Sequence, residues 1–184
     1  MVICVTNRKL CSGSFFDTVR RACQKADMII LREKDLPENE YLVLAQQVMK
    51  ICHEEGRLFC VNKYAAAAKE LGARALQLSF ADFCTFAVNS ERFCKTGASV
   101  HSIEEAVEAE SLGADFLIAG HIFKTDCKKG VTPRGVGFLS EVTEKVNIPV
   151  YGIGGINDAN KSLVYESGGS GICIMSGFMR AENN

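Results

Sequence analysis

The sequence predicts an α/β protein, a compact (β/α)8 TIM barrel whose last helix is short or missing. Short apolar runs alternate with segments of helical periodicity along the 184 residues, giving eight strand candidates. Strand and helix alternating every roughly 20 to 30 residues indicate parallel βαβ units, and eight such units most economically close into a barrel. Three segments, LGARALQL, LGADFLIAG and SGGSGICIMSG, also share a helix-ending glycine followed by an apolar run. A doubly wound open sheet is the alternative architecture.

The first half of the chain supplies four strands and three helices. Val2–Val5 is a short β-rich run, and residues 14–25 carry apolar side chains at helical spacing. The apolar run Met28–Leu31 is the second strand. Pro37 suits the first turn of a helix, and the apolar positions after it form one helical face to about Glu55. The next expected elements are a strand at Leu58–Val61, a helix at Ala65–Leu71 with Gly72 as its C-cap, and a strand at Ala75–Leu78.

The second half is less regular at its start, because residues 80–96 give no clear prediction. Ser102 and Glu105 have the spacing of a capping box for the helix in SIEEAVEAESLG. The other expected elements are strands at Ala98–Val100, Phe116–Ala119, Ile148–Tyr151 and Ile172–Met175, and helices at Val136–Val146 and Asp158–Glu166. Only seven residues follow Gly177, too few for a full eighth helix. A face left uncovered in this way favours a homo-oligomer.

Length and charge predict one domain over residues 1–184 and exclude several partners. The 21 basic and 22 acidic residues nearly balance, and no block of like charges indicates nucleic-acid or membrane binding. No apolar run approaches the roughly 18 residues of a membrane span, and no signal peptide is expected, which predicts a cytoplasmic protein. The nine cysteines show no zinc-type spacing and are interpreted as reduced thiols.

Polar residues follow most of the predicted strands, and in a barrel these positions collect at one end. His121 follows the sixth strand and can move a proton near neutral pH, because its reference pKa is about 6.5. The other candidates carry cations, hydroxyls or amides, which suit an anionic ligand. They are Arg32, Lys34, Asn62, Ser99, Thr125 and Lys128, with Lys63, Asp82 and His101 also at strand ends. The alternative for each basic residue is a solvated charge at the end of the barrel with no role in binding, and for His101 the alternative is a structural role.

Glycines follow the seventh and eighth predicted strands, where barrels often bind phosphate. Gly154 and Gly155 belong to GIGGI, and Gly177 follows Ser176 in MSG. Glycine leaves backbone N–H groups open to a phosphate, although a simple tight turn would use the same residues. This placement predicts a phosphate site built by Gly154, Gly155, Ser176 and Gly177, with the Thr125 hydroxyl nearby.

Six motifs together resemble the thiamine phosphate synthase and TenI superfamily. They occur in the family's order and cover nearly the whole chain: LREK, VNK, GASVHSIEEA, GADFLIAGHIFKTDCKKG, IPVYGIGGI and GICIMSG. The resemblance implies a (β/α)8 barrel that acts in thiamine biosynthesis on a thiazole phosphate. In the synthase, a pyrimidine diphosphate and a thiazole phosphate are joined with loss of pyrophosphate, and two aspartates hold magnesium. Asp82 matches one aspartate, but Lys63 replaces the other, Ile30 replaces a glutamine and Cys127 a threonine.

These departures favour the TenI branch, whose enzymes are thiazole tautomerases. The resemblance then implies that His121 transfers the proton that aromatises a carboxythiazole phosphate, with no cofactor. Arg32, Lys34, Asn62 and Lys128 would contact the substrate carboxylate. One alternative is thiamine phosphate synthase with magnesium, for which Asp82 would be a ligand. The other is a non-catalytic sensor that binds a phosphorylated ligand.

Overall fold

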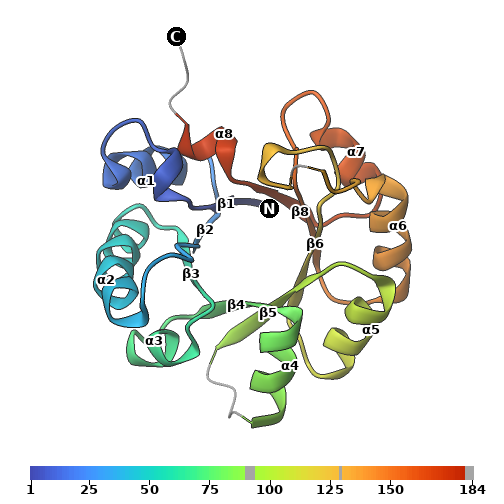
Figure 1. The fold of residues 1–184 in the computed structure, drawn as a ribbon, viewed down its shortest axis with the longest axis horizontal. Coiled ribbons are helices and arrows are strands. Elements are labelled where there is room, and N and C mark those ends of the chain that lie inside the picture. Colours follow the sequence, from blue (N-terminus) through green and yellow to red (C-terminus); the bar gives the residue numbers. More distant parts are fainter. Residues whose placement is uncertain (90–93, 129, 181–184) are drawn as a thin grey trace. The chain divides into compact units, whose positions relative to one another are not determined.

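The structure, a computed structural model, describes residues 1–89, 94–128 and 130–180. Eight parallel strands, β1 to β8 in chain order, close into a barrel, which confirms the predicted fold class (Figure 1). The last helix, α8, is as short as expected and spans Ser176–Met179. The chain divides into two compact units: unit 1 is Met1–Gln77 with Met175–Asn184, and unit 2 is Leu78–Ile174. That residues 1–184 form a single domain stays a prediction.

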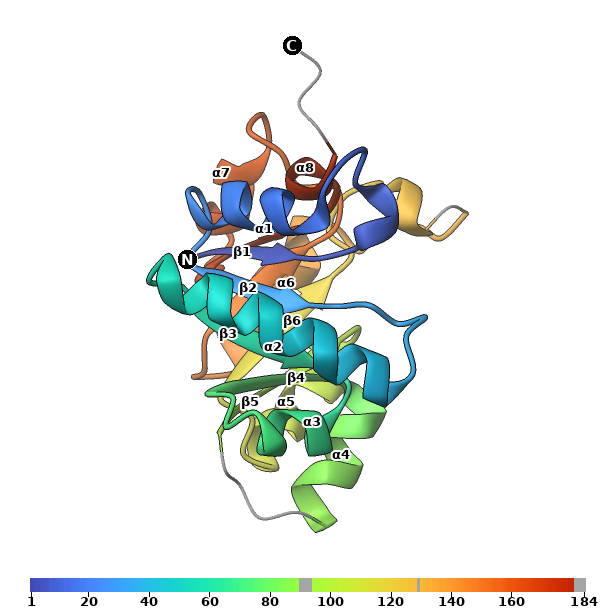
Figure 2. The same ribbon diagram turned by 90° about the vertical axis from the view of Figure 1, so that its left-hand side faces the viewer.

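Unit 1 is built on strands that are buried along most of their length. Its elements are β1 (Val2–Val5), the 3₁₀ helix η1 (Arg8–Leu10), α1 (Phe15–Cys23), β2 (Met28–Leu31), α2 (Glu38–Glu54), β3 (Leu58–Asn62), α3 (Ala65–Glu70), the first part of β4 (Ala75–Ser79) and α8. In β2 every residue is buried, as expected where a parallel sheet is covered on both faces. β2 pairs with β1 and β3, and helix α1 lies beside α2 and α8 (Figures 1 and 2).

Unit 2 continues the same alternation. Its elements are α4 (Phe80–Asn89), β5 (Lys95–Val100), α5 (Ile103–Ser111), β6 (Phe116–Gly120), the 3₁₀ helix η2 (Asp126–Lys128), α6 (Gly135–Lys145), β7 (Val150–Ile153), α7 (Lys161–Glu166) and β8 (Gly171–Ile174). β6 is wholly buried and pairs with β5 and β7, so the loops after these three strands are neighbours. Helices α5, α6 and α7 follow one another along this unit (Figure 1).

Most expected elements are present, with three differences. Residues 80–96 gave no prediction; residues 80–89 form α4, residues 95 and 96 begin β5, and residues 90–93 lie outside the described residues. β7 begins at Val150, two residues later than expected, because Ile148 and Pro149 precede the pairing of Leu117 with Val150. Helix α7 begins at Lys161 rather than at residue 158. In the described part of the chain, no helix is long and apolar enough to cross a membrane.

Candidate functional site

His121 lies directly after the buried strand β6 in unit 2. Its side chain is buried, with only 4% of the residue exposed. The imidazole Nε2 lies 3.3 Å from the backbone carbonyl oxygen of Val131. A carbonyl oxygen can only accept a hydrogen bond, so Nε2 must carry a hydrogen in this arrangement. The ring is therefore fixed in orientation, with Nδ1 as the acceptor atom of the neutral form.

The loop after β7 packs against the backbone next to His121. Ile122 N–H donates to the Ile153 carbonyl at 2.8 Å, and Phe123 N–H donates to the Gly154 carbonyl at 2.9 Å. A Cβ atom added at Gly154 would lie 2.3 Å from the His121 Cβ. The loop that carries His121 and the glycine loop after β7 are thus in direct contact.

This contact gives Gly154 and Gly155 a structural reason that the sequence did not reveal. Both have positive φ angles, 101° and 66°, which residues other than glycine rarely adopt. A Cβ atom at Gly155 would lie 2.4 Å from the Lys124 carbonyl oxygen. The packing of the two loops therefore requires glycine whether or not a phosphate binds there.

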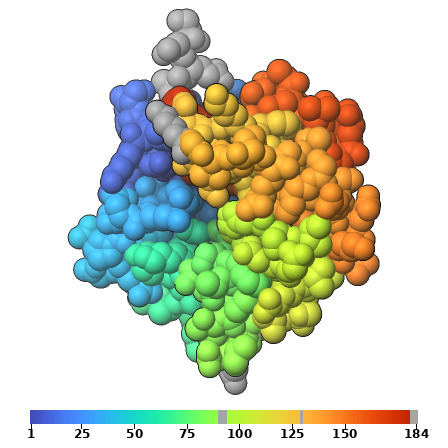
Figure 3. Space-filling model, turned by 45° about the vertical axis from the view of Figure 1, so that its right-hand side comes forward, coloured from blue at the N-terminus to red at the C-terminus, as the bar shows by residue number. Residues whose placement is uncertain are grey.

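The remaining candidates of unit 2 lie on the loops after β5 and β6 and on β5 itself. Ser99 is half-buried in β5, opposite Ile118 of β6. The half-buried Thr125 accepts a hydrogen bond from Cys127 N–H at 3.4 Å. The ammonium Nζ of the exposed Lys128 lies 3.2 Å from the imidazole Nε2 of His101. Figure 3 shows the segment after β6 (gold) at the surface beside the orange helical region of unit 2.

In unit 1, the candidates after β2 depend on a buried carboxylate. Glu33, only 2% exposed, accepts hydrogen bonds from the Thr6 hydroxyl at 2.7 Å and from Arg8 N–H at 3.0 Å. Thr6 Oγ1 in turn accepts from the backbone N–H of Arg32 at 3.0 Å. This network ties the loop after β1 to the backbone between Arg32 and the exposed Lys34. The sequence prediction missed Glu33, although an acid between two cations at the end of a buried strand was a usable signal.

Asn62, at the end of β3, is buried and held by its neighbours. Its amide nitrogen donates to the Gln77 carbonyl oxygen at 3.1 Å and to the Gln77 side-chain oxygen at 2.5 Å. Its backbone N–H donates to the hydroxyl of Tyr41 at 3.0 Å, and that hydroxyl donates to the Leu31 carbonyl at 2.7 Å. Burial raises the pKa of Tyr41 far above its usual value, so the hydroxyl stays protonated. The sequence gave no indication of the Tyr41 bridge between β2 and β3.

Lys63 follows Asn62 and has the positive φ angle of 75°. Its ammonium donates to the Tyr64 hydroxyl at 3.1 Å and lies 4.6 Å from the centre of that ring. The last two candidates lie on α8, where Ser176 is half-buried and Gly177 exposed. Ser176 uses its backbone carbonyl to accept from Arg180 N–H at 3.0 Å.

The predicted site residues therefore form two sets. Arg32, Lys34, Asn62, Ser176 and Gly177 belong to unit 1, and Ser99, His121, Thr125, Lys128, Gly154 and Gly155 belong to unit 2. Within unit 2 the structure brings His121 to Gly154 and places Lys128 against His101. That both sets face one ligand stays a prediction.

The side chains do not fit a magnesium site made by two carboxylates. Lys63 stands where the resemblance expects one of them, and an ammonium repels a cation that needs oxygen ligands. Asp82, the other expected ligand, is exposed and accepts a hydrogen bond from the Ser79 hydroxyl at 2.5 Å. Among residues 1–89, 94–128 and 130–180, no group of three or more His, Cys, Asp or Glu side chains could hold a metal ion.

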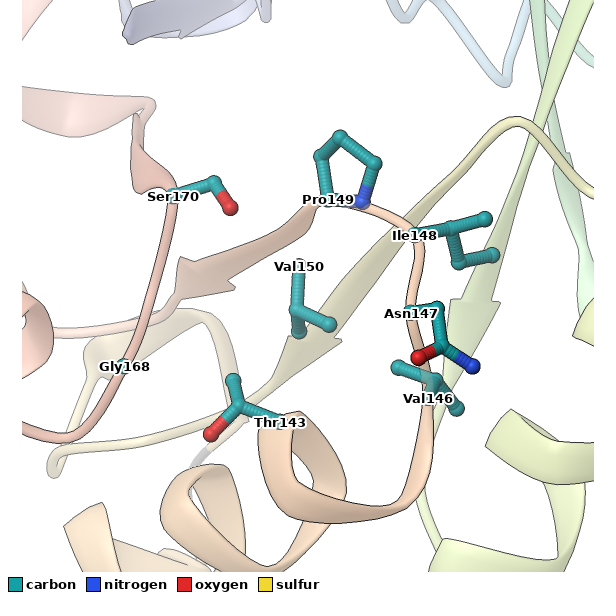
Figure 4. Close-up of a pocket in the computed structure, with 8 residues that line it drawn as sticks. All are labelled: Thr143, Val146, Asn147, Ile148, Pro149, Val150, Gly168 and Ser170. Carbon is teal, nitrogen blue, oxygen red and sulfur yellow. The ribbon is translucent and has the colours of Figure 1, made fainter.

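A separate pocket of unit 2 lies between the end of α6, the start of β7 and the start of β8 (Figure 4). It has a volume of about 260 Å³ and is lined by Thr143, Val146, Asn147, Ile148, Pro149, Val150, Gly168 and Ser170. None of these side chains is charged. The pocket lies at the amino ends of the strands, away from the loops that carry the candidate residues, and we assign it no role in catalysis.

Comparisons with known proteins identify the family. The sequence profile described as Thiamine monophosphate synthase matches residues 2–178. A relative named putative thiamine-phosphate synthase 2, from Aquifex aeolicus, is 36% identical over 179 residues, with 95% of each chain covered. The thiamine-phosphate synthase of Pyrococcus horikoshii is 38% identical over 159 residues, which cover 86% of this chain and 77% of the relative.

Solved structures agree with the sequence relatives. A thiamine phosphate pyrophosphorylase from Pyrococcus furiosus superposes with a TM-score of 0.85 at 32% identity, covering 99% of this chain and 88% of that one. A 3-hexulose-6-phosphate synthase reaches a TM-score of 0.67 at 20% identity, covering 95% of this chain and 90% of that one. At that identity the second likeness shows the shared barrel fold alone.

The names of these relatives correct the predicted activity. The sequence was interpreted as a thiazole tautomerase, an isomerase, but the relatives from Pyrococcus horikoshii, Pyrococcus furiosus and Syntrophomonas wolfei are named as synthases. The tautomerase prediction is wrong, and the synthase alternative agrees better with the comparisons. Proton transfer by His121 in that isomerisation is withdrawn with it, and a catalytic role of His121 stays a prediction. A profile match over residues 2–178 and relatives above 30% identity place the chain in the thiamine monophosphate synthase family.

Proposed function

We propose that this protein is a thiamine-phosphate synthase, a transferase that joins a pyrimidine diphosphate to a thiazole phosphate and releases pyrophosphate. The observation that carries the proposal is the family match over residues 2–178, together with relatives of that name that align over most of their own length. We also propose a cytoplasmic location, as the sequence predicted.

The chemistry asks for positive charge near the departing diphosphate. When the bond between the pyrimidine methylene and the diphosphate breaks, negative charge builds up on the leaving oxygen, and fixed cations and N–H donors lower the energy of that state. Lys128 is the candidate cation of unit 2, on the loop after β6. Arg32 and Lys34 are the candidates of unit 1, on the backbone held by the Glu33 network.

The glycine loops are proposed to bind the phosphate of the second substrate. In unit 2, the backbone of Gly154 and Gly155 packs against the loop that carries the half-buried Thr125. Ser99, near the end of β5, supplies a further hydroxyl group. In unit 1, Ser176 and Gly177 start α8. His121, whose imidazole Nε2 contacts the Val131 carbonyl oxygen, lies on the loop that packs against Gly154.

Magnesium accompanies this reaction in the family as the resemblance describes it, but the residues do not fit a dedicated two-carboxylate site. We therefore assign the protein's own positive charges to the diphosphate. Lys63, an exposed residue, adds a cation at the position where a carboxylate was expected. The expected small-molecule partners are thus two phosphorylated heterocycles, the pyrimidine diphosphate and the thiazole phosphate. That the protein forms a homo-oligomer stays a prediction.

The test uses the purified full chain with hydroxymethylpyrimidine diphosphate and thiazole phosphate. Thiamine phosphate and pyrophosphate are measured in parallel, once with magnesium and once with a chelator. We expect the two products in equal amounts. Lys128→Gln should reduce turnover on the order of 10²-fold, the loss typical of removing one transition-state donor.

The matched control is Lys145→Gln, which removes an exposed lysine from the last turn of α6 in the same unit. Its turnover should equal that of the wild type. Absence of pyrophosphate release both with and without magnesium would refute the synthase proposal. Tight binding of either substrate without turnover would instead support the sensor alternative.

A further inference from the structure

We propose that His101 is a positioning residue for Lys128, whose ammonium it holds with a neutral imidazole and releases when the ring is protonated. This inference rests on the proposed function in one respect, that Lys128 binds the diphosphate. β5 and β6 are paired neighbours, so the loops that carry the two residues lie side by side (Figure 1). The Lys128 Nζ and the His101 Nε2 are 3.2 Å apart.

The contact fixes which ring nitrogen carries the hydrogen. An ammonium group donates hydrogen bonds and cannot accept them, so Nε2 of His101 must be the unprotonated acceptor. The hydrogen of the neutral ring is then on Nδ1. That atom lies 3.7 Å from the carboxylate oxygen Oε2 of Glu105, on the opposite side of the ring from Lys128.

Glu105 is itself held by hydrogen bonds, and it therefore fixes the position of the His101 ring. Its Oε2 accepts a hydrogen bond from the backbone N–H of His101 at 2.6 Å. Its own backbone N–H donates to the Ser102 hydroxyl at 3.1 Å, the capping interaction that starts α5. A carboxylate anchored in the first turn of a helix therefore orients the imidazole toward Lys128.

The charged groups around His101 favour the neutral ring. Partial burial and then the positive charge of Lys128, with a further contribution from Arg134, lower the pKa of His101 below its usual value, while Glu105 opposes the shift. At neutral pH the ring thus accepts the lysine hydrogen bond. Protonation at lower pH removes the acceptor and places two positive charges 3.2 Å apart, which drives the ammonium away.

Two variants of His101 test whether the hydrogen bond to Lys128, rather than the volume of the side chain, matters for binding. His101→Gln retains a side-chain oxygen that can accept the lysine hydrogen bond and cannot titrate. His101→Ala removes the acceptor. We expect His101→Ala to weaken binding of the diphosphate on the order of 10-fold at neutral pH, the loss that corresponds to one hydrogen bond to a charged group. His101→Gln should bind within about threefold of the wild type, as expected where one acceptor replaces another.

The main measurement is the affinity for inorganic pyrophosphate, by titration calorimetry between pH 5 and 8.5. Free pyrophosphate gains protons over this pH range in the same way whichever variant is titrated. A difference in pH dependence between variants therefore reports protonation of the protein. Relative to His101→Gln, the wild type should lose affinity as the pH falls through the His101 pKa. In the background of Lys128→Gln, His101→Ala should have no further effect. Thermal denaturation of each variant shows whether it is folded.

The outcomes distinguish this inference from the proposed function. Equal acid losses in the wild type and His101→Gln, or no pyrophosphate binding by the wild type, would overturn the inference. A pH-dependent difference in binding without any synthase turnover would uphold it and refute the synthase. If the substrates do turn over, KM for the diphosphate should change in His101→Ala far more than kcat.

Discussion

Replacing Gly154 by alanine tests whether the glycine loop is required by packing. The added Cβ would lie 2.3 Å from the Cβ of His121 and 2.9 Å from its Cα, closer than non-bonded carbon atoms approach. Neither contact is with the flexible end of a side chain, so relief requires movement of the loop backbone. The backbone conformation, with φ at 101°, is a second obstacle for any residue with a side chain.

The magnitude follows from these two contributions. A non-glycine residue held in a sparsely populated region of φ and ψ costs about 1–3 kcal/mol. Inserting a methyl group into a packed contact costs about 1–3 kcal/mol more. We expect Gly154→Ala to lower the free energy of unfolding by about 3 kcal/mol, which in a chain of this length lowers the Tm by about 6–12 °C.

The assay is urea and thermal denaturation without ligand, against Gly137→Ala as the matched control. Gly137 lies in α6, and a Cβ there would meet nothing within 4 Å. The same chemical change should therefore be neutral or stabilising by up to about 1 kcal/mol, because alanine favours the helix. If Gly154→Ala unfolds within about 0.5 kcal/mol of the wild type, a surface-like effect, the packing requirement is refuted.

Two further predictions concern buried polar groups of unit 1. Tyr41→Phe removes the hydroxyl that bridges the Leu31 carbonyl and the Asn62 N–H, which should cost about 2 kcal/mol because both backbone groups are buried. Glu33→Gln removes the charge that accepts the Thr6 hydroxyl, and should also lower the free energy of unfolding by about 2 kcal/mol. Urea midpoints that match the wild type would contradict either prediction.

The barrel could be predicted because its strands carry an unambiguous pattern. MIIL of β2 and FLIAG of β6 are buried at every position, and both were found as continuous apolar runs. Parallel strands covered on both faces produce such runs, and the helices between them supply the regular spacing. Local composition and long-range topology therefore agreed over most of the chain.

Helix α4 was missed because its sequence is rich in apolar and aromatic residues, which suit a strand as well as a helix. The helix buries Phe83 and Phe86, but Val88 on the same helix is 74% exposed. Aromatic and β-branched residues also favour strands, so the segment FADFCTFAVN carried contrary signals. Contacts with other elements decided the outcome, and a sequence window does not contain them.

The sequence placed the candidate residues in or just after the strands, but it did not give the structural reason for each residue. A glycine reads the same in the sequence whether it opens the backbone to a phosphate or admits another loop, and Gly154 shows the second use directly. A structural role was the alternative for His101, and nothing in its local sequence points to Lys128, 27 residues away. Pairings of this kind depend on which strands are neighbours.

The activity was misassigned because the loss of one expected magnesium ligand was taken as evidence against the synthase reaction itself. Lys63 in place of a carboxylate removes an oxygen donor for magnesium, but it also adds a fixed positive charge. A departing diphosphate needs positive charge, which an ammonium and a metal ion can each supply. The substitution therefore speaks against one way of holding magnesium and leaves diphosphate chemistry open, in agreement with relatives named as synthases.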